Sequence, residues 1–331
     1  MSLPFEALAA AVQGNCDISD AAFARDMTLC NYLLAMREYF CWAQGLPPGR
    51  EPDRAAVGAW IAARERRWDA LDDAEYAPLP LPSGPADPFA VEAINAVLAT
   101  EGWVYGAAVG RFGKPHFFLG RLARSERREG IDVVEVGREV ARDIEAAPAS
   151  LAAGRIVLRG EAFERWLWSS ARSWDRAHES GPMRAALAAY GYEADPARAI
   201  AAMAAAQRET LLLHELGEHA AGRMLGEPWE AYLRSRTDRR AALSARAVRD
   251  LLADCLVTLP AIADRKCEAS LHFWFATFDG LRREFFPELT QAYGEICRRG
   301  DWQALVTACR DGCERWAQVA RALVQDAAAP Q

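Results

Sequence analysis

Lysine is nearly absent from this chain. Its 331 residues include Lys114 and Lys266 and no other lysine, so almost all of the positive charge comes from arginine. Acidic residues outnumber Lys and Arg by 46 to 39, and the formal net charge is −7. A nucleic-acid backbone favours a basic partner. The charge balance therefore argues against nucleic acid as a ligand.

The sequence also lacks long apolar runs and paired cysteines. No uninterrupted apolar segment is long enough to cross a bilayer, and residues 1–13 have no basic region before them, as a secretory signal would require. None of the eight cysteines belongs to a CxxC pair, so reduced thiols are the simplest interpretation. We expect a cytoplasmic protein without a membrane partner, and the sequence leaves its oligomeric state open.

Apolar periodicity predicts a mainly helical fold. Strands are indicated by short aromatic and β-branched runs at 103–109, 116–122, 131–136 and 155–158. The proline-rich residues 78–88 predict a loop. Helices are expected at 17–45, 53–71, 88–100, 161–178, 181–190, 195–225, 228–236, 238–263, 267–299 (broken near Pro287) and 301–325.

These elements predict two domains. Residues 1–160 are expected to hold the N-terminal helices and a small three- or four-stranded antiparallel β-sheet, inserted near residues 102–160. Residues 161–331 are expected to form a helical bundle.

The most informative segment is residues 211–219, Leu-Leu-Leu-His-Glu-Leu-Gly-Glu-His, which contains two of the five histidines. The apolar run that leads into it places the ionisable groups on a helix that starts from the interior. Burying such groups costs free energy unless something compensates them, and a bound metal ion is the usual compensation. This segment therefore indicates a candidate metal centre.

His214-Glu215-x-x-x-His219 resembles the HExxxH motif of the dipeptidyl peptidase III zinc metallopeptidases. The resemblance implies that the two histidines bind zinc and that Glu215 activates the water. Residues 249–254, Arg-Asp-Leu-Leu-Ala-Asp, look like the acidic helix that supplies the third ligand in that family. This implies Asp250 as a ligand and Asp254 as a partner that orients a histidine. The resemblance covers two short segments, and that family has glutamate at the position of Asp250.

Helix geometry limits this interpretation. Positions i and i+5 lie about 140° apart around a regular helix, so His214 and His219 can share one ion only if the helix bulges around residues 216–218. If the helix is regular, His214 instead shares a face with Glu218.

Two alternatives follow from a regular helix. His214, Glu215 and Glu218 with Asp250 and Asp254 would suit a dinuclear iron or manganese site in a bundle, which favours an oxidase or oxygenase. Without any metal, Glu215 could pair with His219 and His214 with Glu218 on the helix surface. The aspartates of the helix expected at 238–263 could then pair with Arg246 or Arg249.

Three further residues are candidate substrate contacts. Lys114 and His116 lie in the expected hairpin, and His272 lies in the aromatic segment 271–275. A histidine in such a segment is also typical of a core residue with one satisfied hydrogen bond. In a metal-free binding or scaffold protein, the aromatic residues 271–278 would be a contact surface.

The whole chain is similar to an uncharacterised bacterial family of unknown function. Residues 16–19 (Cys-Asp-Ile-Ser), 112–119 and 247–256 carry this resemblance, which implies no activity. We therefore expect a zinc-dependent hydrolase with one divalent metal ion and a small-molecule or peptide substrate. The alternatives are a dinuclear iron oxidase or oxygenase and a metal-free binding or scaffold protein.

Overall fold

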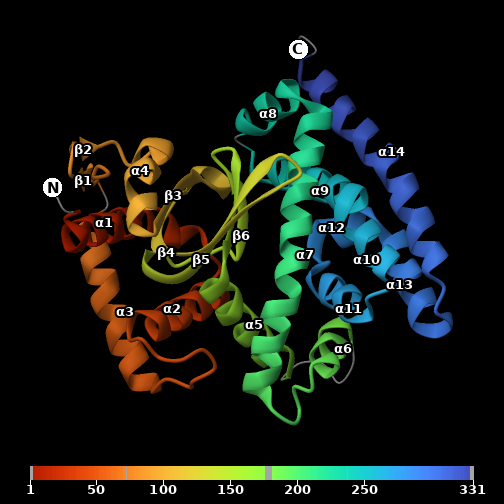
Figure 1. The fold of residues 1–331 in the computed structure, drawn as a ribbon, viewed down its shortest axis with the longest axis horizontal. Helices are drawn as coiled ribbons and strands as arrows, with labels where there is room; N and C mark the ends of the chain where they lie inside the picture. The colour runs from red at the N-terminus through yellow and green to blue at the C-terminus, as the bar shows by residue number, and fades with distance from the viewer. Residues whose placement is uncertain (1–2, 72, 176–180, 237, 329–331) are drawn as a thin grey trace. The chain divides into compact units, whose positions relative to one another are not determined.

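The computed structural model describes residues 3–71, 73–175, 181–236 and 238–328. The chain divides into two compact units, unit 1 (Met1–Ser169) and unit 2 (Ser170–Gln331). Figure 1 shows their helices and strands. Among the described residues, no helix has the length and apolar character needed to cross a membrane.

Unit 1 combines helices with a five-stranded sheet. Its helices are α1 (Phe5–Phe23), α2 (Leu29–Ala43), α3 (Arg54–Asp69), α4 (Val91–Leu98) and most of α5 (Gly160–Asp175), which continues into unit 2. The sheet has the order β3-β4-β5-β7-β6. Its strands are β3 (Trp103–Val109), β4 (Pro115–Arg128), β5 (Ile131–Arg142), β6 (Ala149–Ala152) and β7 (Arg155–Arg159).

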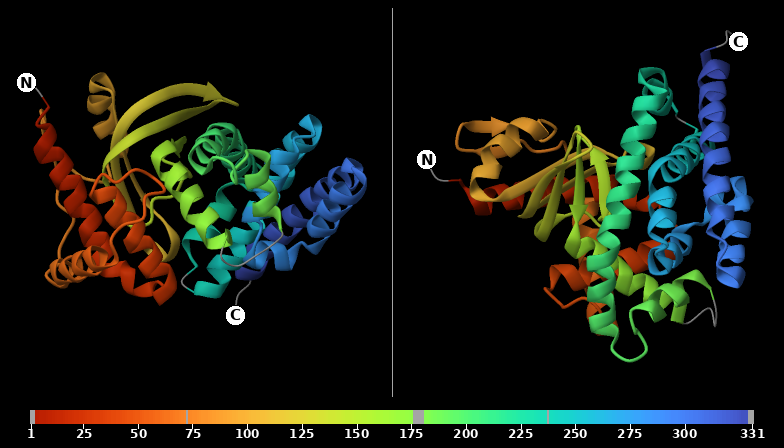
Figure 2. Two further views of the ribbon diagram at one scale, coloured as in Figure 1. Left: turned by 90° about the horizontal axis from the view of Figure 1, so that it is seen from below. Right: turned by 45° about the vertical axis from the view of Figure 1, so that its right-hand side comes forward.

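The mainly helical class is confirmed, but the prediction of a small antiparallel sheet is wrong. Strands β5 and β7 pair in parallel, so the five-stranded sheet is mixed. Register shifts between Leu119 and Arg124 interrupt the β4–β5 ladder, and such irregularities bend strands, as the curved ribbons in Figure 2 show. A separate hairpin of β1 (Leu79–Leu81) and β2 (Gly84–Ala86) occupies the segment that was predicted to be a loop.

The single helix predicted at residues 17–45 is also wrong, because α1 ends at Phe23 and α2 begins at Leu29. Met27 is extended, with ψ 146°, and the Thr28 side chain accepts a hydrogen bond from the Asn31 amide to cap α2. No glycine or proline marks this break. The apolar periodicity continues across it and therefore predicts one uninterrupted helix.

Helix α1 presents an apolar stripe and a polar stripe to the interior of unit 1. Leu8 and Val12 belong to an apolar core that also includes Ile94 of α4 and Phe117 of β4. The polar side is buried as well. Among its residues, Asp20 is fully buried.

The described residues of unit 2 form helices joined by short loops, with no strand among them. Helix α7 is continuous, and helices α9 and α10 are joined by the π-helical turn Asp254–Thr258. The segment predicted as one helix with a break near Pro287 forms three, α11 to α13. The helices are α6 (Pro182–Ala189), α7 (Pro196–Leu225), α8 (Glu227–Arg234), α9 (Arg239–Ala253), α10 (Leu259–Arg265), α11 (Glu268–Thr277), α12 (Gly280–Phe285), α13 (Pro287–Arg299) and α14 (Trp302–Ala328).

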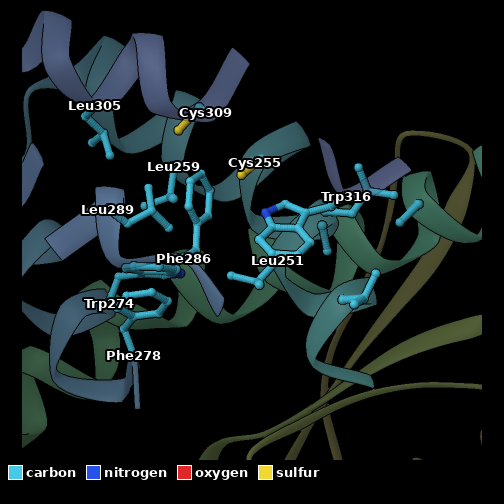
Figure 3. Close-up of a cluster of buried hydrophobic side chains, with 14 of the residues drawn as sticks. Leu251, Cys255, Leu259, Trp274, Phe278, Phe286, Leu289, Leu305, Cys309 and Trp316 are labelled. Atoms are coloured by element: carbon cyan, nitrogen blue, oxygen red, sulfur yellow. The ribbon is translucent and has the colours of Figure 1, made fainter. Parts of the chain in front are cut away.

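A large apolar core holds these helices together. Figure 3 shows Cys255 of the π turn and Cys309 of α14 among the leucines and aromatic rings of the core. Trp274 stacks on Phe278 with ring centroids 4.8 Å apart, and both are buried. Trp274, Phe275 and Phe278 therefore belong to the core of unit 2, and Phe273 is buried as well. The expectation that the aromatic residues of 271–278 form a contact surface is wrong.

Candidate metal centre

The candidate centre is built where α7 lies against α9 and the π turn. Figure 1 shows α7 and α9 next to each other. Gly217 permits a close approach, because a Cβ atom at this position would lie 2.4 Å from the Ala253 carbonyl oxygen. The two helices therefore meet through backbone at this point. The contact places His214 and Glu218 of α7 beside Asp250 and Asp254.

Helix α7 is regular from Pro196 to Leu225. The bulge that a shared His214–His219 site requires is therefore not there, and that prediction is wrong. His214 pairs instead with Glu218 on the same face, with 3.5 Å between Nε2 and Oε1. His219 does not belong to the cluster that this face forms with α9.

Three side chains bring metal-ligand atoms together. His214, Glu218 and Asp250 each offer one ligand atom, and these atoms lie within 4.8 Å of one another. Their side chains are 25%, 11% and 18% exposed, so each is partly accessible to solvent. Within the described part of the chain, no other group of three His, Cys, Asp or Glu residues meets the same distance criterion.

Asp254 orients His214 through the Nδ1 atom of its ring. Its carboxylate is fully buried, and Oδ1 lies 2.8 Å from Nδ1 of His214. A proton on Nδ1 that is donated to this carboxylate leaves the Nε2 lone pair directed away from Asp254. A carboxylate–histidine pair of this kind fixes the tautomer and the ring orientation of metal-binding histidines.

The π turn that contains Asp254 has a cause in the sequence. Pro260 has no N–H to donate to the carbonyl of Leu256, and its ring crowds that carbonyl. The helix passes this point with wider turns, and the Leu259 amide donates to the Asp254 carbonyl five residues earlier. Single π turns often mark functional sites. The local helix distortion therefore lies between α9 and α10 and not in α7.

Two arginines surround the carboxylates. Arg249 Nη2 donates to Glu218 Oε1 at 2.5 Å and to Asp250 Oδ1 at 3.0 Å. Arg282 of α12 lies with Nη1 3.4 Å from Asp254 Oδ2. The pair between Arg249 and Asp250 is one that the metal-free alternative predicts. Arg282 could not be found from spacing, because it is 28 residues from Asp254 along the chain.

Burial and neighbouring charges shift the pKa values of the cluster in different directions. Burial alone would lower the pKa of His214, but Asp254 and Glu218 raise it well above its ordinary value. Burial would raise the pKa of Asp250, yet Arg249 and His214 hold it below its usual range. Without a metal ion, the cluster is thus a set of strongly coupled ion pairs.

Glu215 differs from these groups. Its side chain is buried, and burial raises the pKa of its carboxyl to about 8, with Glu218 adding in the same direction. None of the hydrogen bonds or ion pairs between described residues involves this carboxyl. It therefore lies beside the candidate ligands as a carboxyl that has no structural partner.

Lys114 and His116 belong to a separate ion-pair network in unit 1. Lys114 Nζ lies 2.9 Å from Asp20 Oδ1 and 3.0 Å from Glu145 Oε2. His116 Nδ1 lies 2.9 Å from Oδ2 of the fully buried Asp143. Lys114 is only 3% exposed, so its ammonium is bound within unit 1 and is not offered to a substrate.

His272 lies in α11 and has a hydrogen-bond partner of its own. Its Nδ1 is 2.8 Å from the hydroxyl of Tyr293 on α13, and the two rings meet edge to face. His272 is also outside the His214, Glu218 and Asp250 cluster. These contacts match the alternative of a histidine with one satisfied hydrogen bond.

The environment of His272 predicts a pH effect on stability. Burial lowers its pKa in the folded state, whereas Glu268 acts more weakly in the opposite direction. Below about pH 6.5, the ordinary value for histidine, the unfolded chain binds this proton more readily than the folded chain. His272 should therefore contribute a loss of stability to unit 2 as the pH falls through this range.

Replacing His272 with glutamine should reduce this pH dependence. Urea unfolding of wild type and H272Q between pH 7.5 and 5 would measure it, with unit 2 followed by hydrogen exchange. A slope of unfolding free energy against pH that is equal in the two proteins would contradict the expectation.

The cluster of His214, Glu218 and Asp250 could hold a single metal ion. Zinc bonds of about 2.0–2.1 Å in tetrahedral geometry place two ligand atoms about 3.3 Å apart, close to the 3.5 Å between His214 Nε2 and Glu218 Oε1. Asp250 could supply a third ligand atom from the facing helix. Catalytic zinc sites typically have three protein ligands and one open position.

Comparison with known proteins gives a family but no activity. No curated protein and no solved structure is detectably similar to the chain, so the resemblance to dipeptidyl peptidase III is not confirmed. Two family models match in succession. Residues 7–159 match the N-terminal domain of a family of unknown function, DUF6866, and residues 164–331 match its C-terminal domain. Together the two matches cover nearly the whole chain, which therefore belongs to the DUF6866 family.

Proposed function

We propose that this protein is a hydrolase that depends on one divalent metal ion, with zinc favoured. In this proposal His214 Nε2 and carboxylate oxygens of Glu218 and Asp250 bind the ion. The observation that carries the proposal is the geometry at His214. A buried carboxylate holds its Nδ1 at 2.8 Å, and its Nε2 lies 3.5 Å from the carboxylate of Glu218.

Glu215 is the proposed general base. A metal ion lowers the pKa of a bound water toward neutrality. Its positive charge would also favour the ionised form of the nearby Glu215 carboxyl, which could then accept the proton. Glu215 follows His214 directly, is buried, and has no hydrogen-bond partner among the described residues that would hold its oxygens. His219 has no role in this revised site.

A dinuclear site is less well supported. A second ion would need further carboxylate oxygens, but those of Asp254 face His214 Nδ1 and Arg282. Arg249 also contacts Glu218 and Asp250. A second divalent cation would be placed among these guanidinium groups, and like charges at short range are unfavourable.

Glu218→Gln should weaken metal binding at least tenfold, because it removes an anionic ligand at the centre of the cluster. Glu215→Gln should leave metal binding unchanged and abolish turnover. Glu209→Gln is the matched control, because Glu209 lies on the same helix, pairs with Arg265 and is outside the cluster.

The experiment has two stages. Protein stripped with a chelator is titrated with zinc, iron(II) and manganese(II) by calorimetry, and metal content is measured after purification without added metal. Metal-loaded protein is then screened for hydrolysis of ester, amide and phosphoester substrates. No metal uptake by the wild type rejects the site, and two ions per chain would favour the dinuclear alternative. Loss of metal binding in E215Q would make Glu215 a ligand instead of the base.

A further inference from the structure

One nitrogen of the Arg249 guanidinium, Nη1, is not used by the ion pairs of the cluster. The hydrogen bonds of Arg249 with described residues involve Nε and Nη2, which donate to Asp250 Oδ1 and Glu218 Oε1. Nη1 takes part in none of them, nor is it among the buried polar atoms without a partner. The side chain is 21% exposed. Its Nη1 group therefore offers two N–H donors at the accessible side of the cluster.

The position of this group relative to the candidate ligands is informative. Arg249 Nη2 contacts Glu218 Oε1, the same oxygen that lies 3.5 Å from His214 Nε2. The guanidinium is thus adjacent to the point where a shared ion would stand. An ion bound to Glu218 and Asp250 would neutralise the carboxylates that now attract Arg249. The positive charge of Arg249 would then be unbalanced, and an anion bound beside it would stabilise it.

We propose that the substrate of this site carries an oxyanion, a carboxylate or a phosphate, which Arg249 binds through Nη1 beside the metal ion. This inference rests on the proposed function and specifies its substrate class. Guanidinium groups suit both anions because their planar N–H donors match the oxygen spacing of carboxylate and phosphate. Arg282 lies on the other side of Asp254 and adds positive charge to the same region.

The test is oxyanion binding by the metal-loaded protein. Wild type, Arg249→Met and Arg249→Lys are each loaded with one equivalent of zinc and titrated with inorganic phosphate and with acetate. The metal-loaded wild type should bind at least one of the two anions, and the preferred one identifies the group that the substrate carries. In R249M this affinity should fall at least tenfold, which is the scale of a lost charge-assisted hydrogen bond.

R249K separates charge from geometry. It keeps the positive charge and so protects the fold against unpaired carboxylates, but it lacks the planar donors. We expect oxyanion binding intermediate between wild type and R249M, with metal binding retained. Arg223→Met is the control, because Arg223 is an exposed arginine of α7 outside the cluster.

The outcomes distinguish the two proposals. Metal uptake by the wild type with phosphate and acetate affinities unchanged in both R249M and R249K overturns this inference and leaves the metal site intact. The inference is also overturned if the loaded wild type binds neither anion. Failure of the wild type to take up metal overturns the proposed function itself.

Discussion

Replacing Asp20 with alanine should destabilise unit 1 by about 3–5 kcal/mol, the usual cost of removing one partner of a buried ion pair. Asp20 is fully buried, and its Oδ1 lies 2.9 Å from Lys114 Nζ. Its Oδ2 accepts a hydrogen bond from the Ile144 amide. The alanine variant would leave both donors without this acceptor, and Lys114 would depend on Glu145, which is 44% exposed.

A double variant distinguishes the loss of the Asp20–Lys114 ion pair from a general effect of substitution at residue 20. Combining Asp20→Asn with Lys114→Met removes both charges and keeps an acceptor for the Ile144 amide. Much of the lost stability should therefore return. Asp53→Ala is the control in the same unit, because Asp53 is an exposed cap of α3 that bonds the Ala56 amide. Its loss should cost about 0.5–2 kcal/mol.

Urea unfolding, with hydrogen exchange to follow each unit separately, would measure these differences. A D20A protein within 1 kcal/mol of D53A would contradict the expected cost of a buried, unpaired lysine.

The second large effect concerns Gly217. In Gly217→Ala the new Cβ would lie 2.4 Å from the Ala253 carbonyl oxygen and 2.8 Å from its carbon. Backbone cannot rotate away as a side chain can, so α7 and α9 must separate. Overpacking typically costs about 1–3 kcal/mol and occasionally more, which exceeds the gain of about 0.8–1 kcal/mol from replacing glycine in a helix.

Gly222→Ala on the same helix is the matched control. Its Cβ would lie 3.5 Å from Glu230 Oε1, an ordinary contact, so only the helix propensity should change, and the variant should be slightly more stable. Because Gly217 sets the spacing between the ligands of α7 and Asp250, G217A should also bind metal more weakly. Equal stability and equal metal affinity in the two variants would show that the close contact of α7 and α9 at Gly217 is needed neither for stability nor for metal binding.

The sequence predicted α7 well because its signals are local. Asp195 caps the helix, Pro196 occupies its first turn, and Gly226 follows its last residue. The mixed sheet could not be predicted from the sequence, because strand pairing depends on how the chain between β5 and β7 crosses over. Periodicity and composition do not report that path.

The candidate centre was predicted in part. The spacing argument allowed either His219 or Glu218 as the partner of His214, and only the regular backbone of α7 decides between them. Pro260 is a signal that sequence reasoning could have used, because a proline within a predicted helix requires a local change in hydrogen bonding. Arg282 comes from a separate helix, so its contact with Asp254 is a result of tertiary packing alone.

The scarcity of lysine makes chemical labelling a selective probe of this fold. Of the two lysines, Lys266 is exposed at the end of α10, whereas Lys114 is 3% exposed. An amine-acylating reagent should modify Lys266 rapidly and reach Lys114 only when unit 1 opens locally. The rate at which Lys114 is acylated in the native protein therefore reports how often this ion-pair network comes apart.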